Sequence, residues 1–317
     1  MILITGGLGF IGTHTTRALL DLGEPCLLLQ RRPPRDPFPG EGVTVEQADL
    51  TDEAALLALG DKYEITSILH LAGSFPWPPG ADEPVQGARQ ALTGLLNVFA
   101  AATAWRVSRL GLASTIGVYG GAPGTGPFAE DTPLPLTAPH PIPGFKKIAE
   151  LLADHLAGAG GLDVVTYRIG AIWGPLGHSP SPFFAAPQLV HAAARGTAVQ
   201  VHPARADNPP RAEEAIDLCY VKDCGRALAL LQTAATLRHR TYNVATGRPT
   251  TNGEVAAALR ELVPDARIEL PEGRGPGARD VWLDITRLRE DTGYEPAYDT
   301  RRAAAEYLAW LRAGHDR

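Results

Sequence analysis

Residues 1–12, MILITGGLGFIG, decide the fold of this chain. MILIT (1–5) is a short apolar run of strand length that leads directly into a cluster of glycines. A helical pattern follows and stops at Gly23. Its apolar face carries Ile11, Thr15, Ala18, Leu19 and Leu22. The segment therefore predicts a strand, a tight glycine turn and a helix in immediate succession.

The glycines of this turn have the spacing that a dinucleotide requires. Residues 7–12 satisfy G-x-G-x-x-G, and Gly6 adds the reading G-x-x-G-x-x-G. The early glycines make the tight turn and let the backbone approach a pyrophosphate, while the last one allows close packing of helix on strand. The phosphates then meet the free N–H groups of a helix N-terminus. We predict a dinucleotide site here rather than a flexible turn, with contacts from Gly6, Gly9, Phe10, Ile11 and Gly12.

Apolar runs of strand length alternate with helical segments through the first half of the chain. The runs are CLLLQ (26–30), GVTVEQA (42–48), ITSILHLA (65–72), VSRLGLAS (107–114) and LDVVTYRI (162–169). This alternation predicts an α/β protein, a doubly wound parallel sheet with helices on both faces. Beyond residue 170, Pro-rich segments interrupt shorter elements. We therefore predict a dinucleotide-binding domain over 1–169 and a smaller C-terminal α/β substrate lobe over 170–317, with some chain returning to the first domain.

Composition excludes several classes of function. The chain has 317 residues, 44% of them hydrophobic, and a net charge of −6, which argues against general affinity for nucleic acids. Its three cysteines, Cys26, Cys219 and Cys224, have no metal-ligand spacing and indicate reduced thiols. No apolar run is long enough to span a bilayer. We expect a cytoplasmic globular protein with a small-molecule substrate, no metal and no membrane or nucleic-acid partner.

The end of the second predicted strand bears on the choice of dinucleotide. Many dinucleotide folds place a carboxylate there to hold the ribose 2′-OH, but this strand ends in Gln30, Arg31 and Arg32. Arginines pair with a 2′-phosphate, so we favour NADP over NAD, the alternative being that both arginines belong to a solvated loop. Asp49, after the third strand, is placed to hold an adenine amino group or else to cap a helix.

Eight motifs in register resemble the extended short-chain dehydrogenase/reductase family, the NAD-dependent epimerase/dehydratase group. They are TGGLGFIG, ADLTD, ILHLAG, ASTIGVYG, RIGAIWGP, CYVKD, YNVATG and LDITRLREDTGYEP, and they extend from residue 1 to about residue 310. The resemblance implies a Rossmann domain that carries NAD(P) and a substrate cleft at the carboxyl ends of the strands. It also implies cofactor contacts from Leu50, Leu71, Ala72, Gly73, Lys146 and Ile169.

The same resemblance implies a catalytic arrangement. The family uses a Ser/Thr that hydrogen-bonds the reacting oxygen, and a Tyr-x-x-x-Lys pair in which the tyrosine exchanges a proton and the lysine binds the nicotinamide ribose. The Ser/Thr position, four residues before Tyr119, is Thr115. The lysine position, four residues before a helical Glu150, is Lys146, and Lys147 is expected to be its exposed neighbour.

The tyrosine of the pair is missing. Ile142 stands four residues before Lys146, and no tyrosine lies between residues 120 and 166. His140 and Tyr119 are the candidates to replace it, since a histidine suits proton transfer at neutral pH. The arginine that grips the substrate diphosphate in sugar-nucleotide epimerases is also absent, because Ile216 occupies its position next to Asp217. Candidates to compensate for it from nearby loops are Arg205, Arg211, Arg274 and Arg279.

Three functions remain open. We favour an NADP(H)-dependent reductase, dehydrogenase or epimerase that acts on a hydroxyl or ketone of a small, sugar-like or specialised biosynthetic substrate. The alternatives are a non-redox isomerase, dehydratase, lyase or cyclase on the same fold, and a non-catalytic dinucleotide-binding protein. The resemblance further implies a homodimer in which helices over about 84–104 and 144–158 pair with their symmetry mates. Simple packing on the sheet explains the apolar pattern of those helices equally well.

Overall fold

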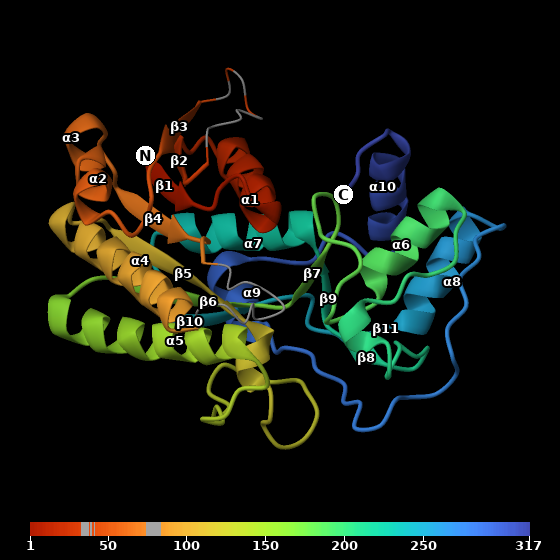
Figure 1. Cartoon of the computed structure of the whole chain (residues 1–317). Coiled ribbons are helices and arrows are strands. Elements are labelled where there is room, and N and C mark those ends of the chain that lie inside the picture. The colour runs from red at the N-terminus through yellow and green to blue at the C-terminus, as the bar shows by residue number, and fades with distance from the viewer. Residues whose placement is uncertain (33–37, 39, 41, 74–83) are drawn as a thin grey trace. The chain divides into compact units, whose positions relative to one another are not determined.

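The computed structural model describes residues 1–32, 38, 40, 42–73 and 84–317 (Figure 1). The chain divides into two compact units. The first comprises Met1–Ala122, Asp131–Ile169 and Gly225–Tyr242, and the second comprises Pro123–Glu130, Gly170–Cys224 and Asn243–Arg317. One division falls after residue 169, where a boundary is predicted, whereas Pro123–Glu130, predicted within the first domain, belongs to the second unit. None of the described helices is long and apolar enough to cross a membrane.

A seven-stranded sheet forms the centre of the first unit. Its order is β10-β6-β5-β4-β1-β2-β3. The strands are β1 (Ile2–Thr5), β2 (Cys26–Gln30), β3 (Val43–Gln47), β4 (Ser67–His70), β5 (Arg109–Thr115), β6 (Val164–Ile169) and β10 (Thr241–Val244). The pairings from β3 through β6 are all parallel. This sheet confirms the predicted doubly wound α/β class, and its strand order reverses between β1 and β4, where such folds bind ligands.

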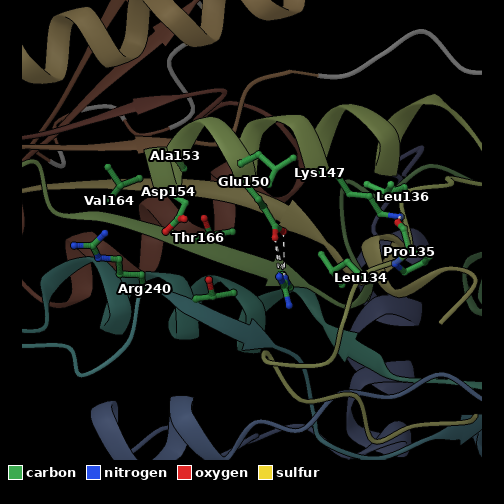
Figure 2. Close-up of a pocket in the computed structure, with 13 residues that line it drawn as sticks. Leu134, Pro135, Leu136, Lys147, Glu150, Ala153, Asp154, Val164, Thr166 and Arg240 are labelled. Atoms are coloured by element: carbon green, nitrogen blue, oxygen red, sulfur yellow. Dashed lines mark hydrogen bonds and ion pairs between the residues drawn. The ribbon is translucent and has the colours of Figure 1, made fainter. Parts of the chain in front are cut away.

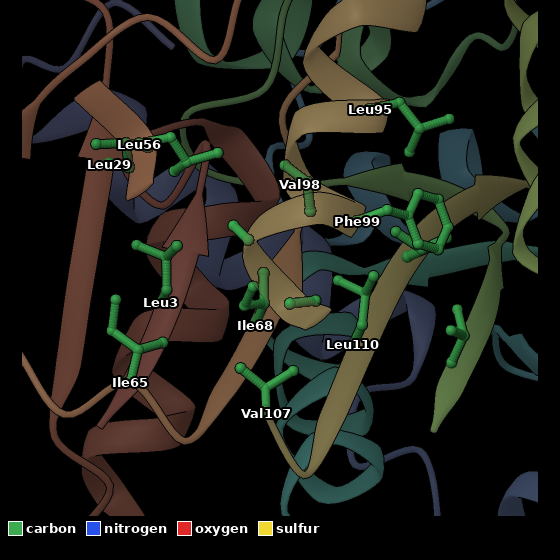
Figure 3. Close-up of a cluster of buried hydrophobic side chains, with 14 of the residues drawn as sticks. Leu3, Leu29, Leu56, Ile65, Ile68, Leu95, Val98, Phe99, Val107 and Leu110 are labelled. Atoms are coloured by element: carbon green, nitrogen blue, oxygen red, sulfur yellow. The ribbon is translucent and has the colours of Figure 1, made fainter. Parts of the chain in front are cut away.

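Helices cover both faces of this sheet (Figure 1). One face carries α4 (Pro84–Ala104) and α5 (Pro141–Gly160), with the short α2 (Glu53–Leu57) and α3 (Leu59–Lys62). The other face carries α1 (Phe10–Asp21) and the part of α7 (Val221–Thr233) that begins at Gly225. The core under α4 is built from aliphatic and aromatic side chains of the helix and strands, among them Leu3, Ile68, Leu95, Val98, Phe99 and Leu110 (Figure 3).

The segment Gly225–Tyr242 returns to the first unit and is bonded into its sheet. Gln232 donates from Nε2 to Ser67 Oγ and to the Ile68 carbonyl (3.1 Å), and its Oε1 accepts from the Tyr167 hydroxyl (3.0 Å). Arg109 donates to the carbonyl oxygens of Leu231 (2.9 Å) and Ala234 (2.7 Å). These buried polar groups on three strands therefore have their partners on the returning segment.

The second unit has small sheets and a helical core. Strand β7 (Ala171–Trp173) pairs in parallel with β9 (Leu218–Tyr220), and β8 (Ala215–Ile216) pairs antiparallel with β11 (Thr250–Thr251). Helices α6 (Ala186–Arg195), α8 (Asn252–Leu262) and α10 (Thr300–Arg312) enclose one apolar core. The remaining elements are α9 (Thr286–Thr292), η2 (Pro203–Arg205) and, in the first unit, η1 (Ile116–Tyr119).

Candidate active site

The glycine turn after β1 is shaped as the motif predicts. Gly6 has a φ of +73°, and its carbonyl accepts a hydrogen bond of 2.9 Å from the Gly9 N–H. A Cβ on Gly12 would lie 2.1 Å from that carbonyl oxygen, so α1 approaches the turn as closely as only glycine permits. Gly9 caps α1 without a side-chain hydrogen bond, which leaves the first N–H groups of the helix, at Phe10 and Ile11, open to an anion. The turn fits a dinucleotide pyrophosphate.

A buried hydrogen-bond chain fixes the loop after β4 against this turn. Thr5 and His70 end neighbouring strands in register, and Thr5 Oγ1 lies 2.7 Å from His70 Nδ1. The same Oγ1 accepts from the Ala72 N–H (3.2 Å), so the hydroxyl proton of Thr5 points to Nδ1. Burial, and then the charge of Lys146, lower the pKa of His70 to about 3. His70 is thus neutral with its proton on Nε2, and residues 71–73 are held beside Gly6.

The carboxyl ends of β2 and β3 carry polar groups where the adenosine half of a dinucleotide lies in such folds. Gln30 Nε2 is buried and makes no hydrogen bond within the described residues, while Arg31 and Arg32 are exposed. Asp49 Oδ1 accepts from the Thr51 N–H (2.9 Å) and hydroxyl (2.8 Å). These bonds, helped by Arg31, lower the pKa of Asp49. The unsatisfied amide and the arginines fit a ribose or its phosphate.

Asp49 is not the cap of the following helix. The N-cap of α2 is Asp52, whose side chain accepts from the Ala55 N–H. The neighbouring Leu50 packs toward α4, where Asn97 Nδ2 donates to its carbonyl oxygen (2.8 Å). The helix-cap alternative for Asp49 is therefore wrong, and its carboxylate remains at the edge of the predicted adenine site.

The two adjacent lysines of α5 have different environments. Lys147 is only 9% exposed, and its ammonium donates to the carbonyl oxygens of Pro135 and Thr137 (2.6 Å). The prediction that Lys147 is exposed is wrong, because residues 131–140 fold over it. Lys146 makes no hydrogen bond or ion pair within the part of the chain that the structure describes. Desolvation lowers the pKa of Lys146 to about 8, although Glu150 acts in the opposite direction.

Thr115 lies beside the first turn of α5. It ends β5, and its Oγ1 accepts from the Gly117 N–H (3.1 Å), which leaves the hydroxyl proton able to bond another oxygen. A Cβ on Gly117 would lie 3.4 Å from Pro143 Cβ and 3.5 Å from Thr115 Oγ1, so the threonine and the turn containing Ile142 are neighbours. Ile169, its register partner on β6, completes this strand end. The first turn of α5, where the tyrosine is expected, therefore packs against Gly117, which also lies against Thr115.

His140 and Tyr119 differ as replacements for that tyrosine. His140 is the N-cap residue of α5, and burial lowers its pKa from the ordinary value. Tyr119 is only 2% exposed, and its hydroxyl accepts from Arg168 (2.9 Å). Arg168 also pairs with Glu150 (2.7 Å), which accepts from Ser114. The geometry disfavours Tyr119 as a proton donor, since its phenol belongs to this buried cluster.

One cavity of the first unit is lined by other residues than these. It has a volume of about 370 Å³, and Glu150 and Asp154 extend into it from α5 (Figure 2). Its lining also includes Thr166 and Arg240, but neither Thr115, Lys146 nor any residue of the glycine turn. The candidate site is therefore located by the glycine motif and by the side chains of Thr115 and Lys146, and not by the size of a cavity.

The substrate contacts predicted in the second unit are engaged within that unit. Asp217 is fully buried and accepts backbone N–H bonds from Thr246 (2.8 Å), Gly247 (3.0 Å) and Leu283 (3.2 Å). Each proposed compensating arginine has a partner: Arg205 pairs with Glu214, Arg274 with Asp280, Arg211 with the Glu272 carbonyl and Arg279 with the Gly124 carbonyl. Asp217 thus orders the loops around β9.

Sequence reasoning did not single out Thr5 or His70. Each ends an apolar strand, and only their parallel register brings the two side chains together. Gln30 was noted only as the residue that stands where a carboxylate is expected, and the burial of its amide nitrogen is a tertiary feature. The sequence did contain one indication of Thr5, His70 and Gln30: each is a polar residue at the last position of a buried strand.

The fold and the glycine turn define a Rossmann-type dinucleotide-binding α/β protein. The pattern of the NAD dependent epimerase/dehydratase family matches residues 2–245. The chain is 31% identical over 315 residues to a dTDP-6-deoxy-L-talose 4-dehydrogenase (NAD(P)(+)) of Kitasatospora kifunensis, covering 96% of this chain and 93% of that one. It is 24% identical to a UDP-glucuronate 4-epimerase of Thermodesulfobacterium geofontis, covering 98% and 95%. The crystal structure of Thermus thermophilus UDP-glucose 4-epimerase in complex with NAD superposes with a TM-score of 0.80 at 25% identity, covering 99% of each chain.

This chain belongs to the NAD-dependent epimerase/dehydratase family. The predicted resemblance is thereby confirmed, and so is the class of enzyme, since the relatives are named nicotinamide-dependent dehydrogenases, epimerases and dehydratases.

Proposed function

We propose that this protein is an NADP(H)-dependent oxidoreductase or epimerase that acts on a hydroxyl or keto group of a sugar-like small molecule. The observation that carries the proposal is the combination of three features at the same end of the sheet. They are an intact glycine turn, Thr115, and a Lys146 that has no hydrogen-bond or ion-pair partner among the described residues. The names of the relatives, which act on dTDP- and UDP-linked sugars, support a nucleotide-linked hexose as the substrate class. Because Ile142 occupies the position of the family's tyrosine, the proposal includes a different group for proton transfer.

The cofactor half of the site fits a phosphorylated dinucleotide. Phosphate would meet the N–H groups at the start of α1, and the ribose end would meet Gln30 and Arg31. When bound, the nicotinamide ring supplies hydride transfer. Thr115 would donate its hydroxyl proton to the reacting oxygen, and residues 71–73, held by Thr5, would line the site between the two halves.

Dinucleotide binding tests the first half of this proposal. Fluorescence titration is expected to give a lower Kd for NADPH than for NADH, because guanidinium groups form charge-assisted bonds to the 2′-phosphate. The double variant Arg31→Ala/Arg32→Ala should weaken NADPH at least tenfold and leave NADH within about twofold. Tighter binding of NADH by the wild type would refute the NADP assignment.

Turnover tests the second half. The protein is incubated with NADP⁺ or NADPH and a panel of UDP- and dTDP-linked hexoses and 4-keto-hexoses, and absorbance at 340 nm and product stereochemistry are followed. A change of oxidation state or configuration supports the proposal. Products that form equally with a redox-inert dinucleotide analogue would favour the non-redox alternative, and tight binding with no product would favour a non-catalytic protein.

We also propose that the protein is a cytoplasmic homodimer formed through α4 and α5. Val85 and Leu96 on α4 and Ile148 and Leu151 on α5 are between 40% and 71% exposed, a concentration of large apolar side chains on two neighbouring helices. All three cysteines are buried and free, in keeping with a reducing compartment. Sedimentation of the wild type should give the dimer mass, and Leu151→Glu should shift it toward the monomer. A monomeric wild type would refute the dimer.

A further inference from the structure

Helix α5 presents three side chains in a line. Ile142, Lys146 and Glu150 are spaced by four residues and therefore lie on one face, one turn apart. Ile142 offers no proton, and the turn that contains it lies beside Thr115. The next group along this face that can exchange a proton is the ε-amino group of Lys146.

The ammonium of Lys146 lies among groups that do not neutralise it. Glu150, one turn further on, already pairs with Arg168 (2.7 Å) and accepts from Ser114. His70, whose pKa the charge of Lys146 helps to lower, is neutral and bonded to Thr5 through Nδ1, so it supplies no negative charge. Lys147 points away, to the carbonyl oxygens of the loop over α5. Lys146 is thus a desolvated cation, and no described residue serves as its fixed counter-ion.

Such a lysine has two accessible protonation states near neutral pH. Burial lowers the pKa of Lys146 to about 8, so the amine and the ammonium coexist around that pH. A guanidinium in the same place would stay charged, which gives a physical reason for a lysine in a chain with four lysines among 29 basic residues.

We propose that Lys146 is itself the acid/base group, exchanging a proton directly with the substrate oxygen that Thr115 holds. This inference rests on the proposed function. In the oxidative direction the O–H bond of the substrate breaks, its proton forms a new N–H bond on the neutral amine, and the hydride on the same carbon goes to the oxidised nicotinamide. In the reductive direction the ammonium returns the proton to the carbonyl oxygen, while the reduced nicotinamide, when bound, would supply the hydride to the carbonyl carbon. Lys146 is then a catalytic residue as well as a ribose ligand.

Titration of Lys146 tests the inference without turnover. Reductive methylation with ¹³C-formaldehyde labels only Lys62, Lys146, Lys147, Lys222 and the N-terminus, and Lys→Arg variants assign each methyl signal. The Lys146 signal is expected to titrate with a midpoint near pH 8, both alone and with NADPH bound. A midpoint near pH 10 in both states would overturn the inference, even if the protein binds NADPH.

Kinetics separate this inference from the proposed function. On any nucleotide-linked hexose that is turned over, Lys146→Arg should lower kcat, measured at saturating dinucleotide, by about 10²- to 10³-fold and remove the alkaline rise of kcat in the oxidative direction, because a guanidinium stays protonated. The control is Lys62→Arg, at a side chain 58% exposed and remote from the site. Unchanged kcat in Lys146→Arg overturns the inference and leaves the proposed function standing. Absence of any turnover instead contradicts the proposed function, while the titration still decides the state of Lys146.

Discussion

The substitution Gly12→Ala is expected to disrupt the dinucleotide site, because the added methyl group has no room between α1 and the glycine turn. The added Cβ would lie 2.1 Å from the Gly6 carbonyl oxygen and 2.8 Å from Gly7 Cα. Real Cβ contacts do not fall below 3.0 Å, so the helix and turn must separate by about 0.9 Å, the difference between 3.0 and 2.1 Å. The turn has little room to move, because the backbone of Ala72 packs closely against Gly6: a Cβ built on Gly6 would lie 2.9 Å from the Ala72 nitrogen.

The change in the free energy of unfolding is the sum of two destabilising contributions and one stabilising contribution. Overpacking of this kind costs about 1–3 kcal/mol, and loss of the Gly9 N–H bond to Gly6 adds about 1 kcal/mol. Replacing glycine by alanine in a helix returns about 1 kcal/mol. The two costs exceed the gain, so the free energy of unfolding should fall by about 1–3 kcal/mol.

The matched control is Gly158→Ala, which is also on a helix but has no heavy atom within 4 Å of the added Cβ. It should raise the free energy of unfolding by about 0.5–1 kcal/mol. Urea unfolding measures both variants, and fluorescence titration measures NADPH binding, which should weaken at least tenfold in Gly12→Ala only. Equal stability of the two variants within 0.5 kcal/mol, with equal NADPH affinity, would refute the reasoning about the turn.

Three further perturbations test other parts of the first unit. Arg168→Met leaves Glu150 buried without its cation and should lower the free energy of unfolding by about 3 kcal/mol in urea; a loss below 0.5 kcal/mol would contradict the buried cluster. Lys147→Met should cost about 1.5–3 kcal/mol through two lost carbonyl bonds yet keep NADPH affinity within threefold, whereas a cofactor defect would show that the assignment of the two lysines is reversed. Because burial lowers the pKa of His70 to about 3, its contribution to stability is complete above pH 6.5 and is lost as the pH falls toward 3. His70→Asn should therefore flatten the decline of stability between pH 6.5 and 4, compared with the same change at exposed His155.

Local chemistry made the beginning of the site predictable. The strand, glycine turn and helix of residues 1–21 depend on backbone conformations that the glycines themselves allow, and the structure has them where the pattern predicts. The positions of Thr115 and Lys146 followed from motif spacing, which fixes them on a strand end and a helix turn. The absence of a tyrosine before Lys146 is a fact of the sequence and needed no structure.

Tertiary contacts made the rest unpredictable. Lys146 and Lys147 are neighbours on a helix, and which one donates to the carbonyl oxygens of Pro135 and Thr137 depends on the path of that loop. The direction of the Tyr119 side chain depends on Arg168, which faces it only through the pairing of β5 with β6. The bond between Thr5 and His70 depends in the same way on the register of β1 and β4. None of these pairings leaves a periodic trace in the sequence.

The returning segment Gly225–Tyr242 has a consequence for the modularity of the chain. A fragment that ends at residue 169 contains every dinucleotide motif, but it lacks Gln232 and the carbonyl oxygens that accept from Arg109. In such a fragment the hydroxyl of Tyr167 would be exposed. The guanidinium of Arg109, a residue only 7% exposed in the whole chain, would lose its carbonyl partners. The dinucleotide-binding unit of this chain is therefore not continuous in sequence, and a fragment meant to fold on its own must include residues 225–242 together with the N-terminal part.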